Sequence, residues 1–174
     1  MGKTLYLIDG HSQLYQAYWA IRGGLSSPAG IPTGAVYGFT NMLRRILNQH
    51  PDYVAVVFDT GKPTFRHGMY TEYKANRPPM PEDLILQIEY VEKVLRAWGI
   101  PILRAEGYEA DDVIGTLARR AAAEGLEVRI LTRDKDALQL LGPHVAIYDN
   151  TKDCLITEAD LQAERGLKPE QVVE

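Results

Sequence analysis

Short apolar segments alternate with longer amphipathic segments along this chain, and that alternation restricts its fold more than any other feature. Apolar runs of strand length occupy residues 4–8, 53–58, 100–103 and 127–131. Apolar residues at helical spacing occupy 11–21, 33–48, 82–98 and 107–125. Strands of this kind, joined by helices, form a parallel sheet with helices on both faces. We therefore expect a three-layer α/β fold with a mostly parallel central sheet.

The last part of the chain adds shorter elements. The pattern predicts two short strands at 145–148 and 154–156 around a turn, followed by a helix over 157–165 that Gly166 ends. The length of 174 residues suits one domain with a real core.

Seven carboxylates follow the four main predicted strands, directly or after a short loop. They are Asp9, Asp59, Glu109, Asp111, Asp112, Asp134 and Asp136. Ligands of parallel sheets bind beyond the carboxyl ends of the strands, and those ends meet at one edge. We therefore expect an acidic site at the carboxyl edge of the sheet.

A simpler interpretation is that these residues only cap helices. Acidic side chains are common in the first turn of a helix, because the free N–H groups there carry partial positive charge. The sequence GYEADDVIG at 107–115 fits such a turn, with Glu109 and Asp112 three residues apart on one helix face. Taken alone, this segment favours capping. Four acidic groups at the same sheet edge are harder to explain in that way, so we favour a shared site.

Crowded carboxylates repel one another unless a cation lies between them. Oxygen ligands without accompanying Cys or His clusters select Mg²⁺ or Mn²⁺. Many carboxylates in one site favour two ions about 3.5–4 Å apart, the arrangement used for in-line attack of a metal-bound water on a phosphodiester. The sequence thus predicts a divalent-metal phosphodiesterase that needs no side-chain nucleophile.

The segment 61–81 shows no clear period and is basic and aromatic. It offers cations that can hold phosphates and aromatic rings that can stack on the bases of a single strand. These are Arg66, Lys74 and Arg77, and Phe65, Tyr70 and Tyr73. The composition agrees equally well with a long surface loop whose aromatic side chains pack on the core.

The net charge of −4 argues weakly against an anionic partner. Removing the seven clustered carboxylates leaves +3, so metal ions bound there would leave a mildly basic surface. No apolar run is long enough to span a membrane, so we expect no membrane partner. The single cysteine, Cys154, fits a reducing cytoplasm.

Six motifs are distinctive when taken together. They are LIDG at 7–10, VFD at 57–59, FRH at 65–67, YKANR at 73–77, GYEADD at 107–112 and TRDKD at 132–136. In combination they resemble the 5′-nuclease domain of bacterial DNA polymerase I, a member of the flap-endonuclease group with a PIN-like core. The resemblance covers essentially the whole chain, 1–174.

The resemblance implies a 5′-3′ exonuclease and 5′-flap endonuclease that acts on DNA with a 5′ end or flap, RNA primers included. Such enzymes serve primer removal and repair during replication, at the nucleoid of the bacterial cytoplasm. It implies that the seven carboxylates line the metal site, with Asp111 and Asp134 in catalytic roles. It also implies that Tyr73, Lys74 and Arg77 belong to an arch that the 5′ strand passes through. There Lys74 and Arg77 steer or polarise the scissile phosphate, and the nucleic-acid contacts extend to Phe65 and Arg66.

The family continues past this point with a Gly-Asp-x-Ser-Asp-Asn stretch, which supplies further metal-ligand Asp residues, and a helix-hairpin that grips duplex DNA. Neither these features nor a polymerase domain occurs within the 174 residues. We therefore expect a piece of a larger protein, with two ions bound in the complete protein but weak activity and poor duplex affinity here. Two alternatives stay open: a nucleic-acid-binding fragment that does no chemistry, and a PIN-type ribonuclease that acts on RNA.

Overall fold

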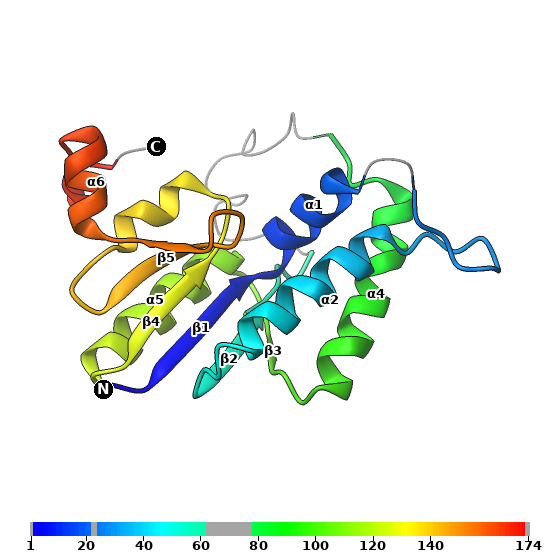
Figure 1. The fold of residues 1–174 in the computed structure, drawn as a ribbon, viewed down its shortest axis with the longest axis horizontal. Helices are drawn as coiled ribbons and strands as arrows, with labels where there is room; N and C mark the ends of the chain where they lie inside the picture. Colours follow the sequence, from blue (N-terminus) through cyan, green and yellow to red (C-terminus); the bar gives the residue numbers. More distant parts are fainter. Residues whose placement is uncertain (1, 22–23, 62–77, 173–174) are drawn as a thin grey trace.

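The strands pair side by side in one six-stranded sheet, ordered β3-β2-β1-β4-β5-β6 (Figure 1). In chain order they are β1 (Thr4–Asp9), β2 (Tyr53–Val57), β3 (Ile102–Leu103), β4 (Glu127–Leu131), β5 (Val145–Asp149) and β6 (Cys154–Ile156). All neighbouring strands are parallel except β5 and β6, which pair antiparallel. This computed structural model describes every residue except 1, 22–23, 62–77 and 173–174.

Helices form most of the connections between the strands. They are α1 (Gly10–Ala20), α2 (Gly34–Leu47), α4 (Glu82–Ala97), α5 (Ala110–Ala123) and α6 (Glu158–Arg165), with 3₁₀ helices η1 (Lys135–Leu140) and η2 (Pro169–Gln171). Within the described ranges, none of these helices combines the length and the apolar composition needed to cross a bilayer.

The sheet separates two apolar cores, because successive side chains of a strand point to opposite faces. Tyr6 and Ile8 of β1 are buried in a core with α1, α2 and α4, which lie together on one side of the strands (Figure 1). Leu7, between them in the chain, is buried in a second core with residues of α5 and β4. The predicted mostly parallel sheet with helices on both faces is thus confirmed.

Most element boundaries agree with the sequence prediction to within a residue or two, and two of the larger differences have local reasons. The third strand covers only Ile102–Leu103. Pro101 has no N–H group for the ladder, and the N–H of Ile100 is used instead to close α4 on the carbonyl of Leu95 at 2.9 Å. α5 begins at Ala110, because Gly107 turns the chain with a φ of 83° and leaves Glu109 in the N-cap position.

The start of α2 is capped by a distant residue. Thr33 occupies the N-cap position, but its side chain makes no capping hydrogen bond. The amide oxygen of Gln87, on α4, instead accepts from the N–H groups of Ala35 and Val36 at 2.7 and 3.2 Å. The buried Gln87 side chain therefore satisfies donors at the beginning of α2 and ties that helix to α4.

The turn from β1 into α1 has no room for a side chain at Gly10. A Cβ atom built there would lie 2.4 Å from the ring of Phe58, which is itself 1% exposed. Gly10 follows Asp9 directly, so this close approach also sets the position of the first predicted carboxylate.

We predict that Gly10→Ala lowers the free energy of unfolding by about 1–3 kcal/mol, the usual cost of overpacking a core. The better helix propensity of alanine offsets only part of that loss. Urea denaturation measures the effect, with Gly142→Ala as control, because no atom lies within 4 Å of a Cβ added there. Equal losses in the two variants would contradict this account of the turn.

Candidate metal centre

The strand order places the carboxyl ends of β2, β1 and β4 next to one another. Asp9 at the end of β1 lies opposite Val57 of β2, and the residue before it lies opposite Leu131 of β4. Asp59 therefore leaves the sheet on one side of Asp9, and the loop that carries Asp134 leaves it on the other. The parallel register alone brings these carboxylates to one edge.

An open cavity of about 860 Å³ lies at this edge. All seven predicted carboxylates line it: Asp9, Asp59, Glu109, Asp111, Asp112, Asp134 and Asp136. The structure thus brings together the complete acidic set from four separate stretches of the chain. That these residues bind metal stays a prediction.

Asp9 is the most constrained of the carboxylates that β1 and β4 contribute. It is 7% exposed, and its two oxygens accept from the Ser12 N–H at 3.1 Å and the Thr132 hydroxyl at 2.8 Å. Burial raises the pKa of Asp9, although both hydrogen bonds oppose that shift. The Thr132 oxygen also accepts from the Asp134 N–H at 3.1 Å, so one hydroxyl links two of the acidic positions.

Asp59 connects β2 to the start of α5 and to α1. Its Oδ1 accepts from the N–H of Ala110, the first residue of α5, at 2.7 Å. Nδ1 of His11 lies 3.3 Å from the Asp59 N–H and 3.5 Å from Oδ2 of the same residue. Burial lowers the pKa of His11, although the nearby charges of Asp59 and Asp9 oppose that shift. The His11 ring also packs edge-on against Phe58, with 5.2 Å between centroids.

Glu109 and Asp112 are joined at the beginning of α5. The Glu109 N–H donates to Oδ2 of Asp112 at 3.0 Å, a side-chain cap of the helix start. Glu109 is 8% exposed, whereas Asp111, between them, is exposed. The two acids expected on one helix face are therefore neighbours at the cavity wall.

The capping interpretation and the shared-site interpretation both describe this edge. Asp9 caps the start of α1, and Asp134 caps the start of η1 by accepting from the Asp136 N–H at 3.0 Å. At the start of α5, Asp59 accepts from the N–H of the first helical residue, and Asp112 accepts from the N–H of the N-cap residue. These same hydrogen bonds orient the carboxylates around the cavity. Capping is thus the local means by which the acidic groups are gathered.

The donor set fits hard divalent cations. The cavity offers carboxylate oxygens from four strand ends, no thiol, and one imidazole, His11, among the described residues that line it. Asp9 is buried with a raised pKa, so a nearby cation would stabilise its ionised form. Among the described residues, no three Asp, Glu, His or Cys side chains are arranged closely enough to hold a metal ion.

Five residues predicted to bind nucleic acid lie outside the described residues. They are Phe65, Arg66, Tyr73, Lys74 and Arg77. Their roles stay predictions.

The structure adds cavity residues that sequence reasoning missed. His11 and Ser12 lie two and three residues after the predicted Asp9, and this closeness in the sequence was the only signal for them. Arg133 directly precedes the predicted Asp134 in the TRDKD motif, and its N–H donates to the Ser12 hydroxyl at 2.8 Å. Among the described residues that line the cavity, Arg133 is the only lysine or arginine. Trp19 also lines the cavity, although nothing in its position along the predicted helix indicated a function.

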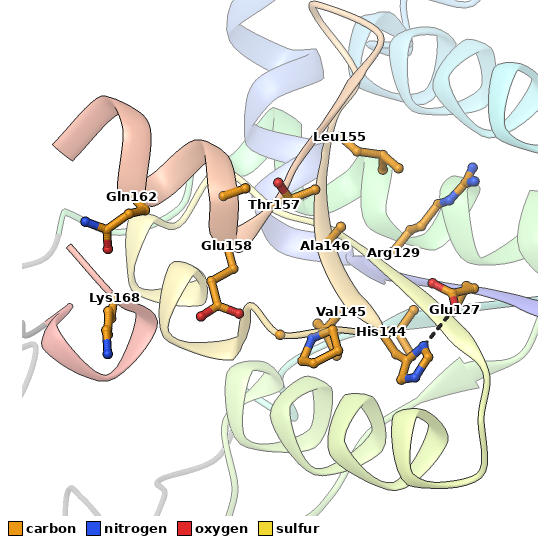
Figure 2. A pocket seen from close by; sticks show the side chains of 14 residues that line it. Glu127, Arg129, His144, Val145, Ala146, Leu155, Thr157, Glu158, Gln162 and Lys168 are labelled. Carbon is orange, nitrogen blue, oxygen red and sulfur yellow. Dashed lines mark hydrogen bonds and ion pairs between the residues drawn. The ribbon is translucent and has the colours of Figure 1, made fainter. Parts of the chain in front are cut away.

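A second hollow, of about 820 Å³, lies at the amino ends of β4 and β5, beside α6 (Figure 2). His144 contacts Glu127 there, with 2.8 Å between Nδ1 and Oε1. None of the predicted site residues lines it. The chemistry predicted from the sequence therefore belongs to the acidic cavity at the other edge.

The sequence matches the profile described as 5′-3′ exonuclease, N-terminal resolvase-like domain, over residues 4–166. It is 45% identical over 180 aligned residues to DNA polymerase I of Bacillus caldotenax, an alignment that covers 100% of this chain and 20% of that protein. The chain thus spans about a fifth of the length of the curated relatives it matches.

Solved structures share the fold. The T5 D15 protein co-crystallised with metal ions superposes with a TM-score of 0.73 at 19% identity, covering 97% of this chain and 63% of that one. A complex of the T5 D15 flap endonuclease with DNA and metal ions gives 0.71 at 18% identity, with 97% and 63% covered. Since the family profile extends from the first strand to the end of α6, this chain belongs to the family of 5′-3′ exonuclease N-terminal, resolvase-like domains.

Proposed function

We propose that this protein is a divalent-metal-dependent 5′-3′ exonuclease and 5′-flap endonuclease that hydrolyses DNA phosphodiesters. The observation that carries the proposal is the gathering of seven carboxylates from four strand ends around one cavity. Membership of a 5′-3′ exonuclease family supports this class of reaction, as does the shared fold of a flap endonuclease that binds DNA and metal ions. The relatives are about five times longer than this chain. The activity of a whole protein of that length is therefore proposed here as well.

The seven carboxylates would hold Mg²⁺ or Mn²⁺, two ions in the complete protein. When bound, such ions stabilise the charge that develops on a reacting phosphate and lower the pKa of water. The chain itself fixes the position of Asp9 and links it to that of Asp134. Asp9 cannot turn without losing two hydrogen bonds, and Thr132 couples it to Asp134. These bonds hold Asp9 and the Asp134 loop in place, whereas the other carboxylates would have to move closer together to enclose an ion.

Cations near the acidic pocket would hold the anionic substrate. Lys74 and Arg77 of the proposed arch steer the scissile phosphate, and the nucleic-acid surface extends to Phe65, Arg66 and Tyr73. The substrates are DNA with a 5′ end or flap and RNA primers paired to DNA, so the setting is primer removal and repair at the nucleoid. Arg133, on the described cavity wall, adds a cation that draws phosphate toward the carboxylates.

Two other functions are distinguished by experiment. A fragment that only binds nucleic acid is disfavoured by the carboxylates themselves, because seven negative charges at one cavity oppose phosphate binding unless metal neutralises them. A PIN-type ribonuclease would cleave RNA in preference to a DNA flap. One assay with labelled 5′-flap DNA, single-stranded DNA and RNA, in Mn²⁺ and in EDTA, separates all three.

We predict that Mg²⁺ or Mn²⁺ raises the melting temperature, because the cations offset repulsion among the carboxylates. Asp9→Asn should raise the melting temperature of the metal-free protein at pH 8 by about 2–4 °C, which corresponds to roughly 1 kcal/mol at this chain length. Folding raises the pKa of Asp9, so the stability this group provides falls as pH rises through that pKa, and the uncharged Asn avoids the loss. The same variant should respond less to Mg²⁺.

Differential scanning fluorimetry with and without EDTA tests these expectations. Asp52→Asn is the matched control, because Asp52 accepts from the Thr4 N–H at 2.8 Å at the opposite edge of the sheet. A wild-type melting temperature that ignores Mg²⁺, or an Asp9→Asn protein with the full metal response, would count against the metal site.

We predict that Asp134→Asn lowers the turnover of a labelled 5′-flap substrate roughly 100-fold or more, the effect of losing several kcal/mol of transition-state stabilisation. Asn can still accept the Asp136 N–H, so the loop keeps its capping bond. The Asp52→Asn control should keep wild-type turnover. Cleavage that persists in EDTA would exclude the metal mechanism.

We predict that Lys74→Ala lowers flap turnover more than Arg119→Ala does. Arg119 is exposed on α5 and does not line the acidic cavity, so its substitution controls for the loss of one positive charge. Steady-state kinetics at fixed ionic strength measure both variants. Equal losses would remove the support for placing Lys74 in an arch.

A further inference from the structure

Trp19 exposes 64% of its surface, which is unusual for the largest apolar side chain. It lies in the last turn of α1, and Tyr15 lies one turn earlier on the same helix face. Both side chains line the cavity that the seven carboxylates share. A large aromatic ring is therefore presented to solvent at the open side of a strongly acidic cavity.

The Trp19 ring is in contact with the ring of the preceding residue, Tyr18. It packs edge-on against Tyr18, with 5.0 Å between ring centroids and 79° between planes. The Tyr18 hydroxyl donates to both carboxylate oxygens of Asp83, at 3.0 and 3.2 Å, and Asp83 stands in the first turn of α4. Anchoring Tyr18 in this way fixes the surface on which the indole rests, so less conformational freedom is lost when a ligand stacks on it.

The helix that carries Trp19 is uncharged where it meets the site. α1 has the sequence GHSQLYQAYWA, with no lysine, arginine, aspartate or glutamate. Such a wall offers no cation to a phosphate, but it accepts the flat, uncharged face of a nucleobase. From Ser12, which contacts both Asp9 and Arg133, the helix rises about 10 Å to Trp19. A base within a few nucleotides of a phosphate at the carboxylates is in reach of the indole.

Trp98, the other tryptophan, does not share this position. Trp98 is 41% exposed, but it ends α4 at the opposite edge of the sheet and does not line the acidic cavity. Single exposed apolar residues of that kind need no functional explanation. Trp19 differs because its exposed ring lies beside the groups proposed to act on phosphate.

We propose that Trp19 is a stacking platform for an unpaired nucleobase of the strand whose phosphate enters the acidic cavity. The inference rests on the proposed function, because it assumes that a nucleic-acid strand occupies the cavity. It deepens that function by assigning base contact to α1, while phosphate contact falls to Arg133 and the metal-binding edge. Stacking is tolerant of sequence, so the platform requires a base without selecting which one.

Fluorescence of a single tryptophan tests the proposal. The chain has two tryptophans, so Trp98→Phe leaves Trp19 as the only one. In the Trp98→Phe, Asp134→Asn double variant with Mg²⁺, titration with single-stranded oligothymidylate should quench the indole emission. An abasic oligonucleotide of the same length should bind more weakly and quench little at saturation. Binding without preference for the strand that carries bases, or equal quenching by both strands, would overturn the proposal.

Substitution gives a second, independent readout. Trp19→Ala should weaken binding of the normal strand about 5- to 150-fold, the range expected for loss of one base–aromatic stack, and should leave binding of the abasic strand nearly unchanged. Trp19→Phe should retain most of the affinity, and Trp98→Ala all of it. Equal weakening for both strands in Trp19→Ala would show a general structural role instead, and near-ultraviolet circular dichroism checks that the variant is folded.

The two proposals fail separately. If flap cleavage is absent but oligothymidylate still quenches Trp19 and the abasic strand does not, the nuclease assignment falls and the stacking platform stands. If metal-dependent cleavage occurs and the two strands behave alike, the stacking platform falls and the nuclease assignment stands.

Discussion

The gathering of carboxylates at one sheet edge is the constraint on which this structure depends. The parallel pairing of β1 with β2 and β4 brings the acidic groups together whatever their charge. Backbone N–H groups at helix starts offset part of the cost, through the bonds from Ser12 to Asp9, from Ala110 to Asp59 and from Asp136 to Asp134. The hydrogen bonds that start the helices are therefore the ones that hold the acidic site.

Placing a buried carboxylate at the start of a helix lowers the stability of the fold. Burial penalises the charged form of Asp9 and raises its pKa, even though two donors oppose the shift. An uncharged amide side chain at this position would avoid the cost of burying a charge. Sites that work against local stability are typically retained for function. The buried charge thus agrees with a cation ligand better than with a purely structural cap.

The sequence predicted the parts of this molecule that have a local signature. Strand–helix alternation identified the sheet, and acids placed after strands identified the carboxyl edge before any coordinates. Contacts between distant positions had no such signature. Gln87 caps a helix that begins more than 50 residues earlier, and Thr132 bonds to Asp9 across 123 positions. Neither residue type, nor its spacing, marks a partner so far away, so these could be found only once the strand order was known.

Helix α1 shows how one element serves both the fold and the site. Leu14 and Ala17 on one face are buried against α2 and the sheet, while the opposite face lines the acidic cavity and ends at Trp19. Its direction is set where it leaves β1, by the Asp9 cap and by the contact of Gly10 with Phe58. A side chain at Gly10 would move the helix start, and with it both the first carboxylate and the exposed indole. The requirement for glycine at this turn therefore comes from the site as much as from the core.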